Sequence, residues 1–168
     1  MIVVYTGDGK GKTSAALGQI VRALGHGMRV ACAQFMKRNG VAGEQKYLAD
    51  QLGEDLYIGG RGFLWDERDF AEHRQAALAT LAWAVDKITE GVQVLVLDES
   101  LYALNLDVVT REELQALLDT VRAKDVHLIL TGRGLPEWLR QEVDLVTEML
   151  PVKHPFTLGG KALQGIDY

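Results

Sequence analysis

The sequence predicts an α/β fold, with a mostly parallel sheet covered by helices on both faces. Apolar runs of the kind found in buried strands alternate with segments of helical periodicity along the whole chain. The first apolar run is followed by a glycine-rich turn that opens a helix-forming segment. At 168 residues, with no linker or repeat, the chain suits one domain spanning residues 1–168.

Six apolar runs are the strand candidates in chain order, and most are bounded by turn-forming or charged residues. They are Ile2–Thr6, Arg29–Phe35, Leu56–Ile58, Gln93–Leu97, His127–Thr131 and Leu145–Met149. The helix candidates between them are Thr13–Leu24, Gly43–Leu52, Glu67–Thr89, Arg111–Ala123 and Pro136–Gln141.

Two of these helices carry specific signals. The 67–89 helix has an apolar stripe at helical spacing that is expected to face the sheet, formed by Leu78, Leu81, Ala82, Val85 and Ile88. The 111–123 helix begins with Thr110 and Glu113 at the spacing of a capping box. Its apolar face is expected to consist of Leu114, Leu117, Leu118 and Val121.

The first strand candidate runs into the loop Thr6-Gly7-Asp8-Gly9-Lys10-Gly11-Lys12-Thr13-Ser14. Its glycines let successive backbone N–H groups point into one concavity, and the next helix adds its positive N-terminal dipole. Lys12 is expected to reach phosphate oxygens and Thr13 to hold magnesium. Thr6 stands where the strict motif has glycine, so a glycine-rich turn with a chance lysine is the alternative. The loop predicts a triphosphate site without specifying which bond breaks.

Polar residues follow the other strand candidates, at the sheet edge where α/β proteins bind ligands. Asp98 and Glu99 end a buried apolar run, and we expect them to hold Mg²⁺ or Mn²⁺ opposite Thr13, Asp98 ahead of Glu99. An acidic cap on the turn, or activation of water by Glu99, is the alternative. Arg133 lies on a glycine-flanked turn, where it contacts nucleotide or forms a salt bridge that orders the loop.

A third feature is the segment Gly59-Gly60-Arg61-Gly62-Phe63-Leu64-Trp65. In an extended loop, Phe63 and Trp65 point to the same side and offer a flat apolar surface. The alternative is that both rings fold back and cap the core. From the local sequence alone, the two arrangements are equally plausible.

Composition excludes several classes of protein. The net charge of −5 disfavours general nucleic-acid binding. Cys32 is the single cysteine, so a disulfide framework is impossible, and its apolar surroundings predict a buried, inert thiol. His26, His73, His127 and His154 lack zinc-site spacing and are expected to be mostly structural, His154 being the least certain. With no membrane-length apolar run and no signal peptide, a soluble cytoplasmic protein is expected.

Taken together, the motifs make the chain similar to the P-loop corrinoid adenosyltransferases. The resemblance covers nearly the whole chain. Besides the loop 6–13, it rests on Ala16-Leu17-Gly18, Arg22-Ala23, Gly25-His26-Gly27, Gln34-Phe35-Met36-Lys37, Gly43-Glu44, Gly62-Phe63-Leu64-Trp65, Leu97-Asp98-Glu99, Thr131-Gly132-Arg133-Gly134, Val152-Lys153-His154-Pro155-Phe156 and Gly165-Ile166-Asp167-Tyr168.

The resemblance implies a P-loop NTPase-like (RecA-like) fold and transfer of the 5′-deoxyadenosyl group of ATP to the cobalt(I) of a corrinoid. Triphosphate leaves, and the product serves adenosylcobalamin synthesis or salvage. The resemblance gives catalytic roles to Lys12, Phe63 and Trp65. Lys12 neutralises the charge of the leaving triphosphate, and the two aromatics lie by the corrin face and displace its lower axial ligand. The family likeness also implies a homodimer and an electron donor such as a reduced flavoprotein.

The chain departs from the family pattern in three places. Leu101 stands where a polar residue is common, Leu163 interrupts a Lys-Ala-Gln sequence, and the amino-terminal segment with which some relatives help to cover the corrinoid is expected to be absent. Two rival functions are a P-loop ATPase or kinase that cleaves the β–γ bond, and a non-catalytic corrinoid carrier. The aromatic segment has no evident role in a plain ATPase.

Overall fold

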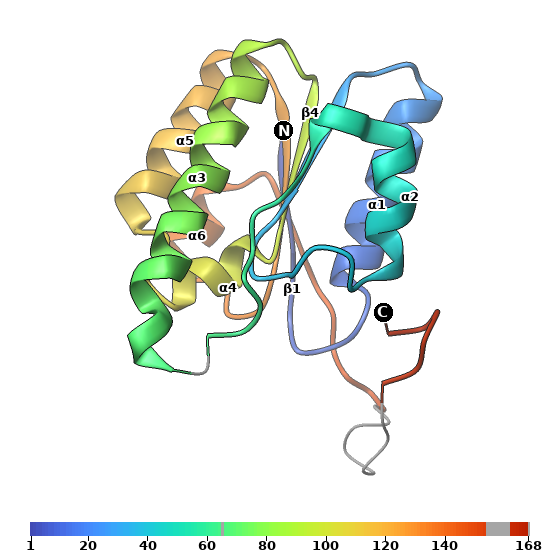
Figure 1. Ribbon diagram of the computed structural model, residues 1–168. Coiled ribbons are helices and arrows are strands. Elements are labelled where there is room, and N and C mark those ends of the chain that lie inside the picture. Colours follow the sequence, from blue (N-terminus) through green and yellow to red (C-terminus); the bar gives the residue numbers. More distant parts are fainter. Residues whose placement is uncertain (65, 154–161, 168) are drawn as a thin grey trace.

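The computed structural model describes residues 1–64, 66–153 and 162–167. Its centre is a six-stranded sheet of order β3-β2-β4-β5-β1-β6 (Figure 1). Neighbouring strands are parallel throughout this sheet. The predicted parallel α/β architecture is therefore confirmed, and all the strands end at the same edge of the sheet.

The strands lie within one residue of the predicted bounds at each end. They are β1 (Ile2–Thr6), β2 (Val30–Gln34), β3 (Leu56–Ile58), β4 (Val94–Asp98), β5 (His127–Thr131) and β6 (Leu145–Glu148). The helices are α1 (Lys12–Gly25), α2 (Gly43–Leu52), α3 (Phe70–Thr89), α4 (Ser100–Asn105), α5 (Arg111–Ala123) and α6 (Glu137–Glu142), with single 3₁₀ turns at Gly53–Asp55 and Glu67–Asp69.

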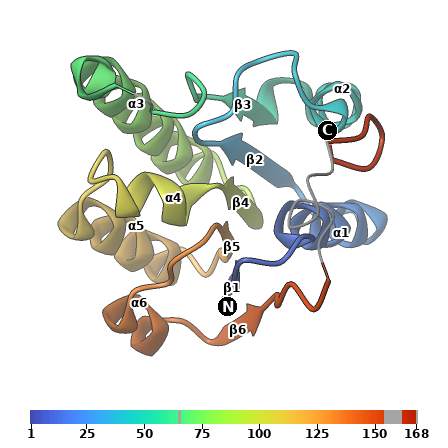
Figure 2. The same ribbon diagram turned by 90° about the horizontal axis from the view of Figure 1, so that it is seen from below.

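Helices cover both faces of the sheet. Figure 2 shows α1 and α2 on one face and α3, α4, α5 and α6 on the other. Along β4, Leu95 and Leu97 belong to the apolar cluster under α3 to α6, whereas Val94 and Val96 belong to the cluster under α1 and α2. Because both faces of the strand are buried, its sequence is continuously apolar rather than alternating.

The predicted stripe of α3 is wrong for three of its five residues. Leu81 and Ile88 are buried, but Leu78, Ala82 and Val85 are exposed. The buried face of the helix is instead formed by His73, Ala77, Thr80, Leu81, Ala84, Lys87 and Ile88. A Cβ added to Gly59 would lie 1.9 Å from Thr80 Oγ1, so the close approach of α3 to the chain after β3 requires glycine at position 59.

The capping box of α5 is confirmed. The backbone N–H of Thr110 donates to Glu113 Oε2 over 2.9 Å, and the N–H of Glu113 donates to Thr110 Oγ1 over 3.3 Å. Arg74 of α3 donates two 2.6 Å hydrogen bonds to the same carboxylate, which together with the capping bonds lowers the pKa of Glu113 to about 2. The apolar face predicted for this helix is buried.

Two other predictions concern the interior. Cys32 is buried as expected, and burial raises the pKa of its thiol. Leu101, one of the family departures, is completely buried in α4 and belongs to the core. Within the described ranges, no helix is both long and apolar enough to cross a membrane.

Candidate functional site

The phosphate loop joins β1 to α1 and packs against the backbone just after β6. The N–H of Gly9 donates to the carbonyl oxygen of Met149 over 2.7 Å. A Cβ at Gly7 would approach that oxygen to 2.4 Å, and a Cβ at Gly9 would approach it to 2.6 Å. Gly7 also has a φ of 98°, which disfavours other residues. Glycine at both positions is therefore required by close backbone packing.

Lys12 lies at the centre of this loop. Its Nζ donates to the carbonyl oxygens of Gly7 and Gly9, each over 2.7 Å. Partial burial, followed by repulsion from the nearby Arg133 guanidinium, lowers the pKa of Lys12. The ammonium group is thus held over the loop by weak neutral partners that anionic oxygens can replace.

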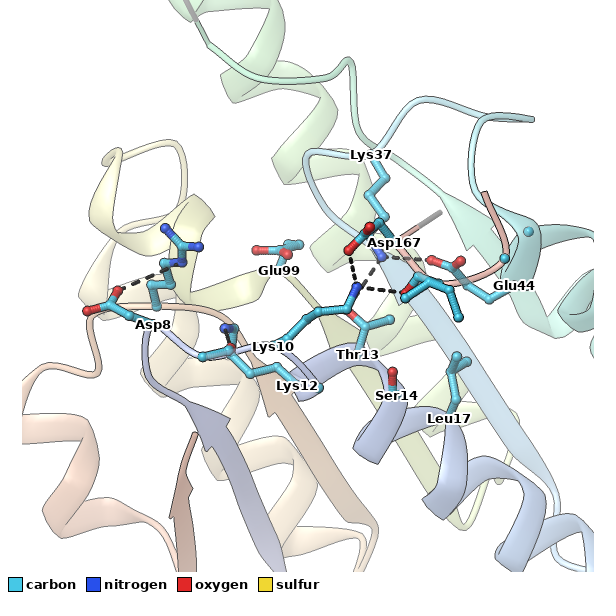
Figure 3. A pocket seen from close by; sticks show the side chains of 16 residues that line it. Asp8, Lys10, Lys12, Thr13, Ser14, Leu17, Lys37, Glu44, Glu99 and Asp167 are labelled. Carbon is cyan, nitrogen blue, oxygen red and sulfur yellow. Dashed lines mark hydrogen bonds and ion pairs between the residues drawn. The ribbon is translucent and has the colours of Figure 1, made fainter. Parts of the chain in front are cut away.

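A cavity of about 590 Å³ opens in front of the loop. Figure 3 shows Lys37, Glu44 and Thr13 grouped at one side of it and Asp8 at the other. The predicted residues that line it are Asp8, Gly9, Lys10, Gly11, Lys12, Thr13, Ser14, Glu99 and Arg133. Thr6 and Gly7 lie behind this wall and shape the loop, since Thr6 accepts a 2.8 Å backbone hydrogen bond from Met149.

Asp98 ends β4 beneath Thr13, with 1% of its surface exposed. Its Oδ1 accepts hydrogen bonds from Thr13 Oγ1 over 2.9 Å and from Thr131 Oγ1 over 2.6 Å. Its Oδ2 accepts from Gln34 Nε2 over 3.0 Å. The carboxylate therefore ties the ends of β2, β4 and β5 to the start of α1.

Glu99 follows in a left-handed conformation, with a φ of 60°, and lines the cavity. Burial, then the charge of Asp98, raises the pKa of Glu99. No cluster of three or more histidine, cysteine or acidic side chains able to hold a metal occurs in the described part of the chain. The Thr13 hydroxyl and the Glu99 carboxylate nevertheless suit Mg²⁺, which commonly takes few protein oxygens and fills its remaining positions with phosphate and water.

Arg133 forms an ion pair, which is one of its two predicted arrangements, and the predicted contact with nucleotide stays a prediction. Its Nε lies 3.8 Å from Asp8 Oδ1 in an exposed ion pair, and its side chain lines the cavity. Asn105 of α4 donates hydrogen bonds to the carbonyl oxygens of Arg133 and Gly134 and so fixes the turn.

A second cavity, of about 470 Å³, lies beside the first and shares Lys37, Glu44, Glu99 and Asp167 with it. Its other walls include Met36, Val41, Phe63 and Tyr102. Phe63 is 60% exposed, and its ring centroid lies 6.0 Å from that of Tyr102 in an edge-on contact. Phe63 therefore faces a cavity instead of capping the core, whereas Trp65 and His154 lie outside the described residues.

The carboxyl-terminal segment also reaches the site. Lys10 Nζ donates to the carbonyl oxygen of Ile166 over 2.7 Å and forms an ion pair with Asp167. Sequence reasoning missed Lys37, Glu44, Tyr102 and Asp167 as site residues. The first two and Asp167 occur in motifs of the family resemblance, but Tyr102 lies on the short α4, which no sequence signal predicted.

Fold and phosphate loop together define a P-loop nucleotide-binding protein. The solved genome-packaging NTPase B204 of Sulfolobus turreted icosahedral virus 2, in complex with ATP-gammaS, shares this fold with a TM-score of 0.55 and 19% identity. The alignment covers 94% of this chain and 78% of that chain.

Sequence comparison identifies the family within this class. The profile of the ATP:corrinoid adenosyltransferase family BtuR/CobO/CobP matches residues 1–168, and the chain belongs to this family. It is 38% identical to a corrinoid adenosyltransferase of Sinorhizobium sp., over all of this chain and 80% of that protein. It is 36% identical to the corrinoid adenosyltransferase of Escherichia coli K12, over all of this chain and 85% of that protein. The predicted transferase family is confirmed.

Proposed function

We propose that this enzyme transfers the 5′-deoxyadenosyl group of ATP to the cobalt(I) of a corrinoid and releases triphosphate, with the two substrates in the two adjoining cavities. The observation that carries this assignment is the wall of Lys37, Glu44, Glu99 and Asp167 common to both cavities. Transfer without a carrier residue requires donor carbon and acceptor metal within near-attack distance of one another. Two adjoining cavities support the binding of both substrates next to one another.

The polar cavity supports binding of the triphosphate. Loop residues Gly9 to Ser14, including Lys12, line the cavity in which we place the leaving triphosphate. Mg²⁺ or Mn²⁺, when bound, would supply further neutralisation of the triphosphate charge. Thr13, Asp98 and Glu99 are the proposed metal residues, of which Thr13 and Glu99 face the cavity and Asp98 supports Thr13 from behind.

The second cavity supports binding of the corrinoid. Phe63 and Tyr102 present aromatic surface there, and Met36 and Val41 extend it, which suits a large macrocycle with an apolar face. Phe63 is proposed to lie under the corrin and to exclude the lower axial ligand, so that cobalt(II) is reduced more easily. Trp65 is proposed to share this role on the strength of the family resemblance.

Several further assignments follow from that resemblance. We propose a single domain over residues 1–168, a homodimeric state and a cytoplasmic location. The cobalt(II) substrate requires an electron donor, for which a reduced flavoprotein is proposed.

Product analysis tests the proposed reaction. The enzyme is incubated with ATP, Mg²⁺ and chemically reduced cob(I)alamin, and the phosphate products are separated by ion chromatography. We expect triphosphate to form in a one-to-one ratio with a light-sensitive alkylcobalt species detected by its absorption spectrum. Formation of ADP and phosphate in its place would show that Glu99 or Asp98 supports cleavage of the β–γ bond.

A further inference from the structure

Lys37, just beyond the end of β2, places an ammonium group among oxygen atoms at the junction of the two cavities. Its Nζ lies 2.8 Å from Asp98 Oδ2 and 2.8 Å from Glu44 Oε1. A third oxygen, Thr13 Oγ1, lies 3.5 Å away (Figure 3). Two carboxylates and a hydroxyl form the kind of oxygen set that a divalent cation takes. Here a lysine ammonium occupies it.

The contact completes the hydrogen bonding of Asp98. Oδ1 accepts from Thr13 and Thr131, and Oδ2 is shared between Gln34 and Lys37. A carboxylate offers about four lone-pair positions, so each oxygen of Asp98 is fully used. Lys37 also supplies the positive charge that a buried carboxylate needs, since burial of an unpaired charge is strongly unfavourable.

The two acidic residues at the end of β4 therefore differ in kind. The charge of Asp98 is neutralised by Lys37, and its oxygens have no hydrogen-bonding position left for a metal. Glu99, in contrast, lines the cavity. Burial lowers the pKa of Lys37, but Asp98 and Glu44 raise that pKa by a larger amount. The net shift is upward, so the ammonium stays charged.

We propose that Lys37 is a positioning residue that keeps Asp98 out of the metal coordination, so that the protein offers Thr13 and Glu99 to a nucleotide-bound metal. The inference rests on the proposed function only for the presence of a divalent metal beside Thr13. It predicts that removal of the Lys37 charge creates metal affinity instead of destroying it. If Lys37 does not restrain Asp98, Lys37→Met gains only the affinity that follows from one removed charge, and the gain is the same with and without the Asp98 carboxylate.

The net charge of the site predicts how tightly each variant binds Mn²⁺. Three carboxylates, Asp98, Glu44 and Glu99, and the Lys37 ammonium leave the wild-type site with two net negative charges. Lys37→Met leaves three, Asp98→Asn leaves one, and the double variant returns to two. Mn²⁺ should therefore bind most tightly to Lys37→Met, equally to the wild type and the double variant, and most weakly to Asp98→Asn.

The experiment is titration of the full chain with Mn²⁺ alone, with free Mn²⁺ measured by electron paramagnetic resonance. We expect Lys37→Met to bind Mn²⁺ about tenfold or more tightly than the wild type, because a full charge is removed within a few ångströms of the site. Lys37→Arg should behave as the wild type. Lys46→Met removes a lysine from the exposed surface of α2 and is the matched control, with no expected change.

The double variant separates this inference from direct coordination by Asp98. The inference predicts that Asp98→Asn costs more Mn²⁺ affinity in the Lys37→Met background than in the wild type, because there it removes a freed ligand as well as a charge. If Asp98 already coordinates the metal in the wild type, the two losses are equal and the double variant binds Mn²⁺ more weakly than the wild type. The inference is also overturned if Lys37→Met binds no more tightly than the wild type, including the case in which neither binds measurably, or if Lys37→Arg matches Lys37→Met.

Folding is monitored by circular dichroism, and Lys37→Gln, which keeps a hydrogen-bond donor beside Asp98, replaces Lys37→Met if the latter unfolds. The measurement uses neither ATP nor corrinoid. If the proposed adenosyl transfer proved wrong, the result of the Mn²⁺ titration would therefore still stand.

Discussion

Lys12 places a positive charge at the wall of the nucleotide cavity, and among the described residues it donates hydrogen bonds to the carbonyl oxygens of Gly7 and Gly9. We predict that Lys12→Ala lowers kcat/KM for adenosyl transfer by roughly 10²–10³, the usual cost of losing one donor to a developing anion. The free energy of unfolding should fall by about 1 kcal/mol or less, since only hydrogen bonds to loop carbonyls are lost. Steady-state kinetics and urea unfolding measure the two effects.

Lys46→Ala is the control for Lys12→Ala, because Lys46 is exposed on α2 and lines neither cavity. Near-normal turnover in a folded Lys12→Ala protein would contradict the phosphate-loop assignment.

A second prediction at the level of a single residue concerns Phe63 and the corrinoid. If its ring forms the wall under the corrin, Phe63→Ala readmits an axial ligand to cobalt(II) and makes reduction limiting. We predict at least a tenfold larger loss of transfer from cobalt(II) than from chemically reduced cobalt(I), about 1.4 kcal/mol of differential stabilisation, with unchanged ATP affinity. The cobalt(II) absorption spectrum in the presence of ATP shows directly whether the four-coordinate form is lost.

Phe70→Ala provides the matched control, because Phe70 is a partly exposed aromatic at the start of α3 that lines neither cavity. Equal losses in both assays of Phe63→Ala, together with weaker ATP binding, would assign Phe63 to packing.

At the element scale, strands and long helices were predictable because each carries its own periodic or continuous apolar signal. β4 shows this most clearly, since both of its faces are buried. α4 and α6 both have six residues, too few for a period to repeat. Proline at the start of α6 marks that helix in the sequence, whereas α4 begins from the left-handed Glu99 without such a signal and was missed. The buried face of α3 depends on how closely the helix approaches Gly59, which is a tertiary property and not a local one.

The pairing of α3 with α5 through Arg74 and Glu113 gives a pH-dependent prediction. The pKa of Glu113 is lowered to about 2 from an ordinary value near 4.5. A depressed carboxylate pKa contributes stability above the unfolded value, and that contribution is lost as pH falls from about 4.5 towards 2. Because the pair is partly exposed, we expect a contribution of about 1 kcal/mol.

Urea unfolding at pH 7, 4 and 3 measures this contribution. The stability difference between the wild type and Glu113→Gln should shrink as the pH falls, since Gln keeps the capping hydrogen bond but not the charge. Glu112→Gln, which removes an exposed neighbouring carboxylate, should show no such convergence. A difference that stays constant across the three pH values would contradict the role of the ion pair.

At the scale of the whole molecule, segments from the early, middle and last parts of the chain meet at one site. The loop after β1, the ends of β2, β4 and β5, and residues 165–167 all line the nucleotide cavity. Convergence of the strand ends was predictable, because parallel strands end at a common edge. The contact of Lys10 with Asp167 was not, since nothing in the local sequence of either residue specifies a partner 157 positions away.

This assembly predicts how nucleotide binding changes the stability of the whole chain. A ligand that contacts so many separate elements binds only the folded state, and at 100 times its Kd it adds about 2.7 kcal/mol to the free energy of unfolding. For a chain of this size, that corresponds to a rise in Tm of roughly 5–10 °C. Scanning calorimetry with Mg²⁺ and ATP in the absence of corrinoid measures the rise.

Hydrogen exchange then locates the effect within the molecule. Slower exchange is expected in residues 7–14, in residues 99–101 and 132–134, and in the carboxyl-terminal residues 165–167, because these segments surround the cavity. Lys12→Ala should lose most of the rise in Tm, while Lys46→Ala keeps it. Protection confined to residues 7–14 would mean that the nucleotide contacts the phosphate loop alone, and that the other strand ends and the carboxyl-terminal segment do not take part in binding it.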